Sequence, residues 1–466
     1  MASASTYLSK TFSTGDNRKK WTWSAWIKRS NLGSDNWLFH AWVNSSNENS
    51  IFFDSSDRLA FSIYEGATNN NGRLTTTRKF RDTSAWFHIQ CVWDSANATA
   101  TDRMIIYVNG ERETSFDTQI NATLNYDSLI NSNNAHYIGQ YGDGTSSMRF
   151  SGCMTHSHFI DGTAYDASAF GETDATTGIW KPKTAPSVTY GTNGFFLKFE
   201  NSGSMGTDSS PNGNNFTVNG NLTQTVDTPS NVFATFNPLI YMPNIPTFEN
   251  GNLYVKGHDA NYCEAISTLS MPKKGKWYAE FQKVEINNSF MVGIGNTNNI
   301  IEALRTNTNI SASGGTYSGG AVTIRDAGDL RQTNVSDISG FFPSSIANTD
   351  IIGLAIDLDN GAVYAHKNGT YGVISSVTGD PTSGASKTGA IDISGQAWYQ
   401  NADFICFLFG NISGATKDWC KANFGNGYFA TTPVASAGSN GNGAIFEYDV
   451  PTGYYALNTK NLNTYG

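Results

Sequence analysis

The sequence predicts an all-β protein built from two antiparallel β-sandwich domains of the jelly-roll type. At 466 residues the chain is too long for one ordinary core, because a domain usually takes roughly 100–250 residues. Aromatic residues make up 13% of the chain and charged residues 15%, and 46 residues are Gly. This balance favours pleated, half-buried sheets joined by many turns. Short apolar runs with a period of two, separated by Asn, Ser, Thr and Gly, indicate strands and turns.

The first domain is predicted over residues 1–200. Its expected strands are residues 21–27, 36–40, 51–53, 59–64, 86–93, 104–108, 137–139, 150–154 and 194–199. The strand at 104–108 runs into Asn109-Gly110. Because both residues tolerate positive φ, this pair predicts a tight hairpin.

An extended connector is predicted over residues 201–249, where Gly, Ser, Asn and Pro surround isolated apolar residues. These apolar residues predict that the connector is ordered and wraps against a neighbouring domain. The second sandwich is predicted over residues 250–466, with strands at 277–281, 290–295, 351–357, 362–366, 404–409 and 422–425. Both halves contain a strand ending in Asp, a polar turn and a second strand that runs into Asn-Gly; in the second half this pair is Asn368-Gly369. We therefore expect the two domains to have related topologies.

Charge and composition exclude several classes of protein. The net charge of −9 argues against a nucleic-acid surface, and so does the absence of Lys and Arg clusters beyond the short runs Arg18-Lys19-Lys20 and Lys273-Lys274. No apolar run approaches the roughly 18 residues of a membrane span, and Met1–Ser5 lacks a signal pattern, so neither membrane insertion nor export is expected. Five cysteines in a long chain argue against a disulfide framework, and Cys91 and Cys406 are expected in the core. His156 and His158 are interpreted as a surface strand pair rather than metal ligands.

Particular motifs resemble two known kinds of domain. The first domain resembles laminin-G-like and concanavalin A-like domains at Trp23-Ser24-Ala25-Trp26-Ile27, at residues 86–94 followed by residues 106–110, and at residues 150–162. The second domain resembles SPRY domains at residues 275–280, 292–294, 352–357 and 422–425. These resemblances imply that both sandwiches have a concanavalin-like fold.

The combination of domains, with residues 227–231 and 236–239 in the connector and residues 454–462 at the end, resembles bacteriophage virion structural and tail-fibre-like proteins. This resemblance implies a virion surface protein that decorates the capsid or forms part of a tail appendage. It further implies other virion proteins as partners, a role in host attachment and a possible homo-oligomer. The chain begins directly with the sandwich rather than with a helical or coiled-coil module. A compact capsid decoration, or a knob fitted to a tail, is therefore expected as the alternative to a fibre.

The sequence contains no catalytic motif, so we expect neither enzymatic activity nor a cofactor. We assign no catalytic or metal-binding residue. Retaining glycosidases of the same fold carry Glu-x-Asp-x-x-Glu on one strand, and the nearest fragment here is Glu172-Thr173-Asp174 in a loop. Asp357-x-Asp359-x-Gly361 is interpreted as a hairpin turn. A cluster of Asp143, Asp161 and Asp166 that holds calcium is the weaker alternative to ordinary Asp-Gly turns.

Sugar binding is the main alternative function, with host polysaccharide as the partner. Lectin sites stack an aromatic ring on a sugar and surround it with polar groups. Five aromatic residues fall in loop-like contexts: Tyr141, Trp180, Tyr317, Tyr371 and Trp398. Most aromatic residues must be core, so no glycan-binding site is assigned from the sequence. Three hypotheses remain: a virion surface protein, a glycan-binding adhesin and, third, a polysaccharide-degrading enzyme.

Overall fold

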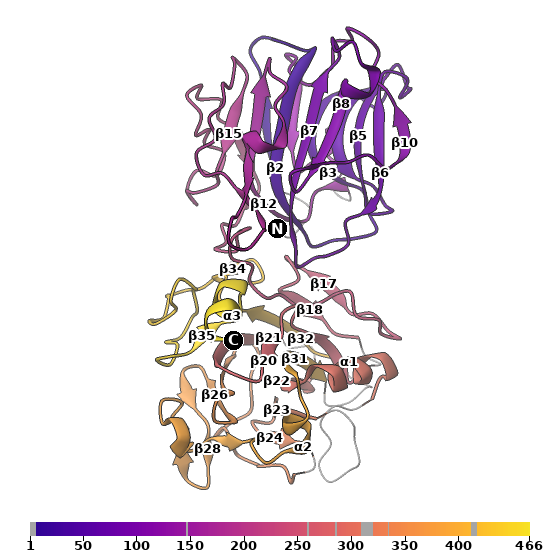
Figure 1. The fold of residues 1–466 in the computed structure, drawn as a ribbon. Coiled ribbons are helices and arrows are strands. Elements are labelled where there is room, and N and C mark those ends of the chain that lie inside the picture. The colour runs from indigo at the N-terminus through magenta and orange to yellow at the C-terminus, as the bar shows by residue number, and fades with distance from the viewer. Residues whose placement is uncertain are drawn as a thin grey trace. The chain divides into compact units, whose positions relative to one another are not determined.

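The computed structural model describes residues 6–145, 148–258, 261–284, 287–308, 320–333, 335–411 and 417–466. Met1–Gln224 and Thr225–Gly466 form two compact units, and antiparallel strands dominate both (Figure 1). The prediction of an all-β fold is therefore confirmed.

The first unit contains two large sheets. The eight-stranded sheet has the order β10-β6-β5-β4-β3-β11-β1-β16, with β10 Phe116–Ile120, β6 Arg73–Lys79, β5 Arg58–Glu65, β4 Asn47–Phe53, β3 Asn36–Asn44, β11 Ala135–Ile138, β1 Tyr7–Thr11 and β16 Thr217–Asn219. The six-stranded sheet has the order β15-β12-β2-β7-β8-β9, with β15 Phe195–Leu197, β12 Gly152–Asp161, β2 Lys20–Arg29, β7 Trp86–Asp94, β8 Met104–Val108 and β9 Glu111–Arg112. A small hairpin pairs β13 Gly171–Thr173 with β14 Trp180–Pro182.

Aromatic residues from both sheets meet in the core of this unit. Trp23 on β2 stacks on Phe39 on β3 with ring centroids 6.0 Å apart and an interplanar angle of 5°. Trp21 contacts Phe61 of β5 at 5.5 Å. Facing sheets whose side chains interdigitate are the expected way for two such sheets to bury their apolar faces. The alternation seen in the sequence thus corresponds to one inward and one outward face of each strand.

Both predicted Asn-Gly hairpins are confirmed. Asn109 and Gly110 have φ values of 50° and 87° and join β8 to β9. Asn368 and Gly369 have φ values of 50° and 83° and join β26 (Ala362–Lys367) to β27 (Thr370–Tyr371). Positive φ at both central positions is what a two-residue hairpin with the right-handed twist of its strands requires.

Residues 201–249 contribute to both units. β16 pairs with β1, and Phe216 packs edge-on against Phe195 with centroids 4.7 Å apart in the first core. From Thr225 the chain belongs to the second unit, where β17 (Thr247–Glu249) pairs with β18 (Tyr254–Lys256).

The second unit also contains two large sheets. The first has the order β17-β18-β32-β21-β25-β26-β27, with β32 Trp419–Asn423, β21 Lys276–Val284 and β25 Ile351–Asp357, while β30 Ile391–Asp392 pairs with β26 and β35 Tyr455–Ala456 with β21. The second has the order β19-β31-β22-β23-β24, with β19 Cys263–Ile266, β31 Phe404–Asn411, β22 Phe290–Asn296, β23 Ala321–Arg325 and β24 Leu330–Gln332, while β20 Met271–Pro272 pairs with β31. Two short hairpins pair β28 Val373–Ile374 with β29 Val377–Thr378, and β33 Tyr428–Phe429 with β34 Thr432–Pro433.

Three helices lie in the described part of the second unit: α1 Thr297–Thr306, α2 Ala397–Gln400 and α3 Thr459–Tyr465. The strand pattern did not predict α1. It starts where the Asn296 side chain accepts hydrogen bonds from the N–H groups of Asn298 and Asn299, and it ends at Asn307, whose φ is 52°. An Asn at each end caps the orphan backbone groups of a helix, which explains why a polar segment becomes helical here.

The expectation of a surface pair at His156 and His158 was wrong for His158. This residue is buried, and its ring stacks on Phe196 at 3.9 Å. His156 has a φ of 48° at an irregularity between Thr155 and His158, which breaks the alternation of β12. A residue inserted in a strand reverses which side chains face inward, so strict alternation misassigns them.

Cys91 and Cys406 are buried in the core as predicted, and the described side chains of Cys91, Cys153, Cys406 and Cys420 form no disulfide. Within the described ranges, none of the helices has the length and apolar character needed to cross a bilayer.

Candidate functional site

Strand β3 presents aromatic side chains on the outer surface of the eight-stranded sheet. Leu38, Phe39 and Ala41 of this strand are buried in the first core. The register with β4 shifts between Trp37 and Phe39, so β3 carries an extra residue at that point. Because a bulge changes which residues face outward, Trp37, His40 and Trp42 lie together on the outer side.

Seven rings from four strands and one loop form this surface. We call it the aromatic face, and it consists of Tyr7, Trp37, His40, Trp42, Phe52, Tyr137 and Tyr141. Trp37 stacks on Phe52 at 4.6 Å with an interplanar angle of 6°, and both are nearly buried. Tyr7, Tyr137, Trp42 and Tyr141 are half-buried and so keep ring surface in contact with solvent.

Tyr141 is the centre of the aromatic face. Its ring centroid lies 4.8 Å from Trp37, 5.1 Å from His40 and 5.1 Å from Trp42. The ring is stacked on His40 and edge-on to Trp42, with interplanar angles of 10° and 66°. Tyr141 and Trp42 therefore form two walls of an aromatic corner.

The loop after β11 can approach β3 closely because residue 142 is glycine. A Cβ atom at Gly142 would lie 2.3 Å from the Cβ atom of Trp42. The Gly142 N–H donates to Nδ1 of His40 at 3.0 Å. A side chain at position 142 would push this loop, and Tyr141 with it, away from the sheet.

Glu48 on β4 is the carboxylate of the aromatic face. Since Nδ1 of His40 accepts from Gly142, the ring proton is on Nε2, which donates to Oε2 of Glu48 at 2.8 Å. His40 is thus a neutral imidazole that positions Glu48. Burial, followed by the charge of Glu48, raises the pKa of the Tyr141 phenol far above its ordinary value. The Tyr141 hydroxyl therefore keeps its proton beside the carboxylate.

Two arginines border the aromatic face. The guanidinium of Arg149 lies 5.6 Å from the ring centroid of Tyr7, and its Nε donates to Oε1 of Gln140 at 2.7 Å. The guanidinium of Arg73 lies 5.9 Å from the Phe52 ring. Cations over aromatic faces are attracted by the ring quadrupole, so these contacts hold the arginines at the border. The face thus combines apolar ring surface with hydrogen-bond donors and an oriented acceptor.

Trp180, another aromatic residue singled out from the sequence, has a different role. It lies on β14, and its Nε1 donates to Nδ1 of His88 at 3.1 Å, while Nε2 of His88 is 2.8 Å from Oγ of Ser24. Because Nδ1 accepts, Nε2 carries the proton and cannot take one from Ser24. Burial lowers the pKa of His88 to about 3. This group is a structural network and not a nucleophile with its base.

The other loop aromatics are also structural where they are described. Trp398 lies on α2 and is nearly buried, and the Tyr371 ring packs edge-on to His366 at 5.4 Å. Tyr317 lies outside the described residues.

The structure does not join Asp143, Asp161 and Asp166 into a calcium site. The Asp161 carboxylate accepts from the side chain of Asn131 and the N–H of Asn193. Asp166 accepts from the Ser168 N–H, and Asp143 from the Thr145 N–H. Across the described ranges, no three His, Cys, Asp or Glu side chains are grouped to hold a metal ion.

Two further acidic motifs are turn elements. The Asp174 carboxylate accepts from the N–H groups of Thr176 and Thr177 and pairs with Lys181 at 3.0 Å. The turn after Asp357 joins β25 to β26, as predicted, and Asp359 accepts from the Gly275 N–H.

The sequence did not identify Trp37, His40, Trp42 and Glu48 as a group. The sequence feature that could have indicated this group is the spacing Trp37-x-x-His40-x-Trp42. A strictly alternating strand would place Trp37 on the face opposite His40 and Trp42, so the spacing did not suggest a common surface. Of the aromatic face, the sequence singled out Tyr141 alone.

Solved structures match this chain only at low similarity. Domains LG4–5 of the mouse laminin α1 chain are 10% identical, with a TM-score of 0.28, over 90% of this chain and 85% of theirs. The SPRY domain of human HERC1 is 13% identical, with a TM-score of 0.26, over 40% of this chain and 96% of its own. A pentraxin of Limulus polyphemus is 18% identical, with a TM-score of 0.24, over 34% of this chain and 71% of its own. These values are too low to transfer a ligand or an activity.

No curated protein matches the sequence. One family model does match, and it covers the part of the first unit that contains the aromatic face. Residues 3–168 match the model described as the concanavalin A-like lectin/glucanases superfamily.

Proposed function

We propose that the first unit binds a saccharide on the aromatic face. The observation that carries this proposal is the corner of Tyr141 and Trp42, with the Glu48 carboxylate held beside it by His40. Aromatic rings stack on the C–H faces of sugars, and a few well-placed polar groups fix the orientation. The match of this region to a superfamily of lectins and glucanases supports the same conclusion.

The charges of the face favour a neutral saccharide. The charges of Glu48 and Asp143 both raise the pKa of Tyr141, while Arg149 and Arg73 border the face, so its positive and negative charges are balanced. A carboxylate accepts hydrogen bonds from sugar hydroxyls and repels an anionic group. We therefore expect neutral polysaccharides of a cell surface as ligands.

The test is a glycan-array screen of the full chain, followed by titration of the best neutral ligand. Trp42→Ala and Tyr141→Ala should each weaken binding about tenfold, since a stacked ring contributes about 1.4 kcal/mol or more. The control is Tyr241→Ala, which removes a tyrosine that is 71% exposed in the other unit. Equal affinities of all three variants and the parent protein would overturn the proposal.

We propose further that binding occurs without turnover. The sequence contains no strand with the paired carboxylates that retaining glycosidases need. Nε2 of His40 already donates its hydrogen bond to Glu48, so it does not serve as a second catalytic group. Incubation of the full chain with each polysaccharide that it binds should release no reducing sugar. Release of reducing ends that Glu48→Gln abolishes would instead establish an enzyme.

We also propose that the protein is displayed on a virion surface, where a sugar-binding sandwich would contact the host. This proposal rests on the sequence resemblance to bacteriophage structural proteins. Immunogold labelling of intact particles with antibody to the chain tests it. Label on the head supports a capsid decoration and label on the tail supports an appendage, whereas particles without label would leave a free lectin.

A further inference from the structure

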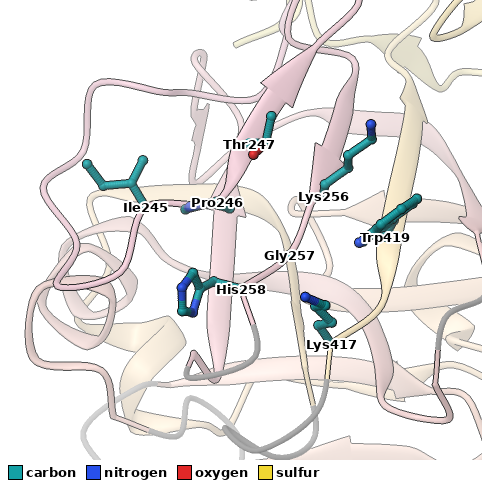
Figure 2. Close-up of a pocket in the computed structure, with 8 residues that line it drawn as sticks. All are labelled: Ile245, Pro246, Thr247, Lys256, Gly257, His258, Lys417 and Trp419. Atoms are coloured by element: carbon teal, nitrogen blue, oxygen red, sulfur yellow. The ribbon is translucent and has the colours of Figure 1, made fainter.

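The second unit contains a hollow of about 240 Å³ that none of the features above explains (Figure 2). It lies beside β17, β18 and β32 and is lined by Ile245, Pro246, Thr247, Lys256, Gly257, His258, Lys417 and Trp419. Three of these residues are basic and none is acidic. In a protein with a net charge of −9, such a lining is unusual.

Lysine and aromatic side chains alternate on the sheet next to the hollow. Lys256 is directly opposite Trp419 in the register, and its Nζ lies 5.1 Å from the Trp419 ring centroid. Tyr254 lies edge-on to Trp419 at 6.0 Å, and Nζ of Lys421 lies 5.8 Å from the Tyr254 ring. The rings are therefore bordered by ammonium groups along two neighbouring strands.

Two acidic side chains near the hollow are turned into the core. Asp418, between Lys417 and Trp419, is fully buried, and its carboxylate accepts from the N–H groups of Asn287 and Ser289, both at 2.8 Å. Glu264 is also fully buried and accepts from the His258 N–H at 2.9 Å. Because successive side chains point to opposite faces, the Asp418 carboxylate points into the core while Lys417 and Trp419 face the hollow.

The floor of the hollow depends on glycine. A Cβ atom at Gly257 would lie 2.7 Å from the carbonyl oxygen of Asp418, so only glycine lets the chain pass this close to β32. Figure 2 shows His258 and Lys417 on either side of this backbone and Trp419 above Lys417. On the rim, Glu249 pairs with Lys256 at 2.8 Å, which offsets one of the charges and holds that ammonium over the Trp419 ring.

We propose that this hollow binds an acidic saccharide, with the sugar ring against Trp419 and its carboxylate or sulfate group at Lys417. Ammonium groups bind such anions through charge-assisted hydrogen bonds, and the indole face supplies the apolar contact. The volume is below the roughly 300–1,000 Å³ of pockets for drug-sized ligands, so a single sugar residue enters while its neighbours lie outside. The site is separate from the aromatic face, whose carboxylate favours neutral sugars.

Calorimetric titration of the full chain with hexagalacturonate, with maltohexaose as the neutral comparison, tests the proposal. We expect hexagalacturonate to bind and maltohexaose not to compete with it. Lys417→Gln and Trp419→Ala should each weaken hexagalacturonate binding at least about tenfold. Binding should also weaken as NaCl rises toward about 1 M, because salt screens exposed charges.

The matched control is Lys460→Gln, which removes an exposed lysine of α3 with the same change in net charge. Unchanged melting temperatures would show that the variants fold. The proposal would be overturned if all variants bound hexagalacturonate with equal affinity, or if maltohexaose bound equally well at this site. It would also be overturned if competition by sodium sulfate showed that the oligosaccharide binds no more tightly than the free sulfate ion.

The tests of the two sites are independent. The acidic-saccharide site is judged by Lys417→Gln and Trp419→Ala with hexagalacturonate, and the aromatic face by Trp42→Ala and Tyr141→Ala with a neutral glycan. A negative result with one pair of variants leaves the other conclusion standing.

Discussion

A single buried carboxylate, Glu280 on β21, organises one region of the second unit. It accepts hydrogen bonds from the N–H groups of Glu447 and Tyr448, both at 2.9 Å, and from the Tyr278 hydroxyl at 3.1 Å. The Tyr278 oxygen is 2.7 Å from Nε2 of His366. Burial lowers the pKa of His366 to about 3, so it stays neutral and donates through Nε2. The carboxylate therefore attaches residues 447–448 to the sheet.

The charge of Glu280 makes the stability of the protein depend on pH. Burial, the largest cause, raises the Glu280 pKa from 4.5 to about 7. Between these values the unfolded chain releases its proton while the folded protein retains it, so stability falls as pH rises from about 5 to 7. Relative to Glu280→Gln, the free energy of unfolding should fall by on the order of 2 kcal/mol over this range.

Denaturant unfolding of both proteins at several pH values measures this difference. Glu280→Gln should itself be less stable at pH 5, because its amide cannot accept all the hydrogen bonds that the carboxyl group accepts. Parallel stability curves for the two proteins would show that the Glu280 pKa is close to its ordinary value.

At the level of the elements, irregularities in strands decide which side chains reach the surface. In β3 the shift after Trp37 creates the aromatic face, and in β12 the shift between Thr155 and His158 buries a histidine. The regular strands were predicted from the sequence, and residues 104–108 and 351–357 correspond to β8 and β25 in full. Strands β6 and β10, which are short of apolar residues, were not predicted.

The bulge in β12 can be tested through His156, whose φ of 48° lies in the left-handed region. A β-branched residue is strained there, whereas glycine is not. His156→Val should be about 1–2 kcal/mol less stable than His156→Gly. Thermal unfolding of the two variants measures this, and equal stability would mean that the bulge can move along the strand.

At the level of the whole molecule, the first core extends beyond the predicted first domain. Residues 1–200 include most strands of the first unit, but β16 and Phe216 lie after them and complete the same structure. Phe216 is only 5% exposed, so its loss leaves a large cavity.

The stability of two fragments tests whether the first unit ends at residue 200 or at residue 224. A fragment of residues 1–224 should melt about 6–12 °C higher than a fragment of residues 1–200, because removing a buried phenylalanine costs about 3 kcal/mol or more. Phe216→Ala in the longer fragment should reproduce most of this loss. Equal melting temperatures of the two fragments would show that residues 201–224 add nothing to the core.

The sequence by itself determined the fold class, the tight hairpins and much of the core. These features depend on local rules: Asn-Gly pairs adopt positive φ, and alternation assigns a strand its two faces. Tertiary structure alone decided the composition of the two sites. Tyr141 meets Trp42 because Gly142 lets a loop approach β3, and Lys256 meets Trp419 because β18 pairs with β32 in one register. Neither contact follows from spacing, since each joins residues distant in sequence whose meeting depends on strand register and close backbone approach.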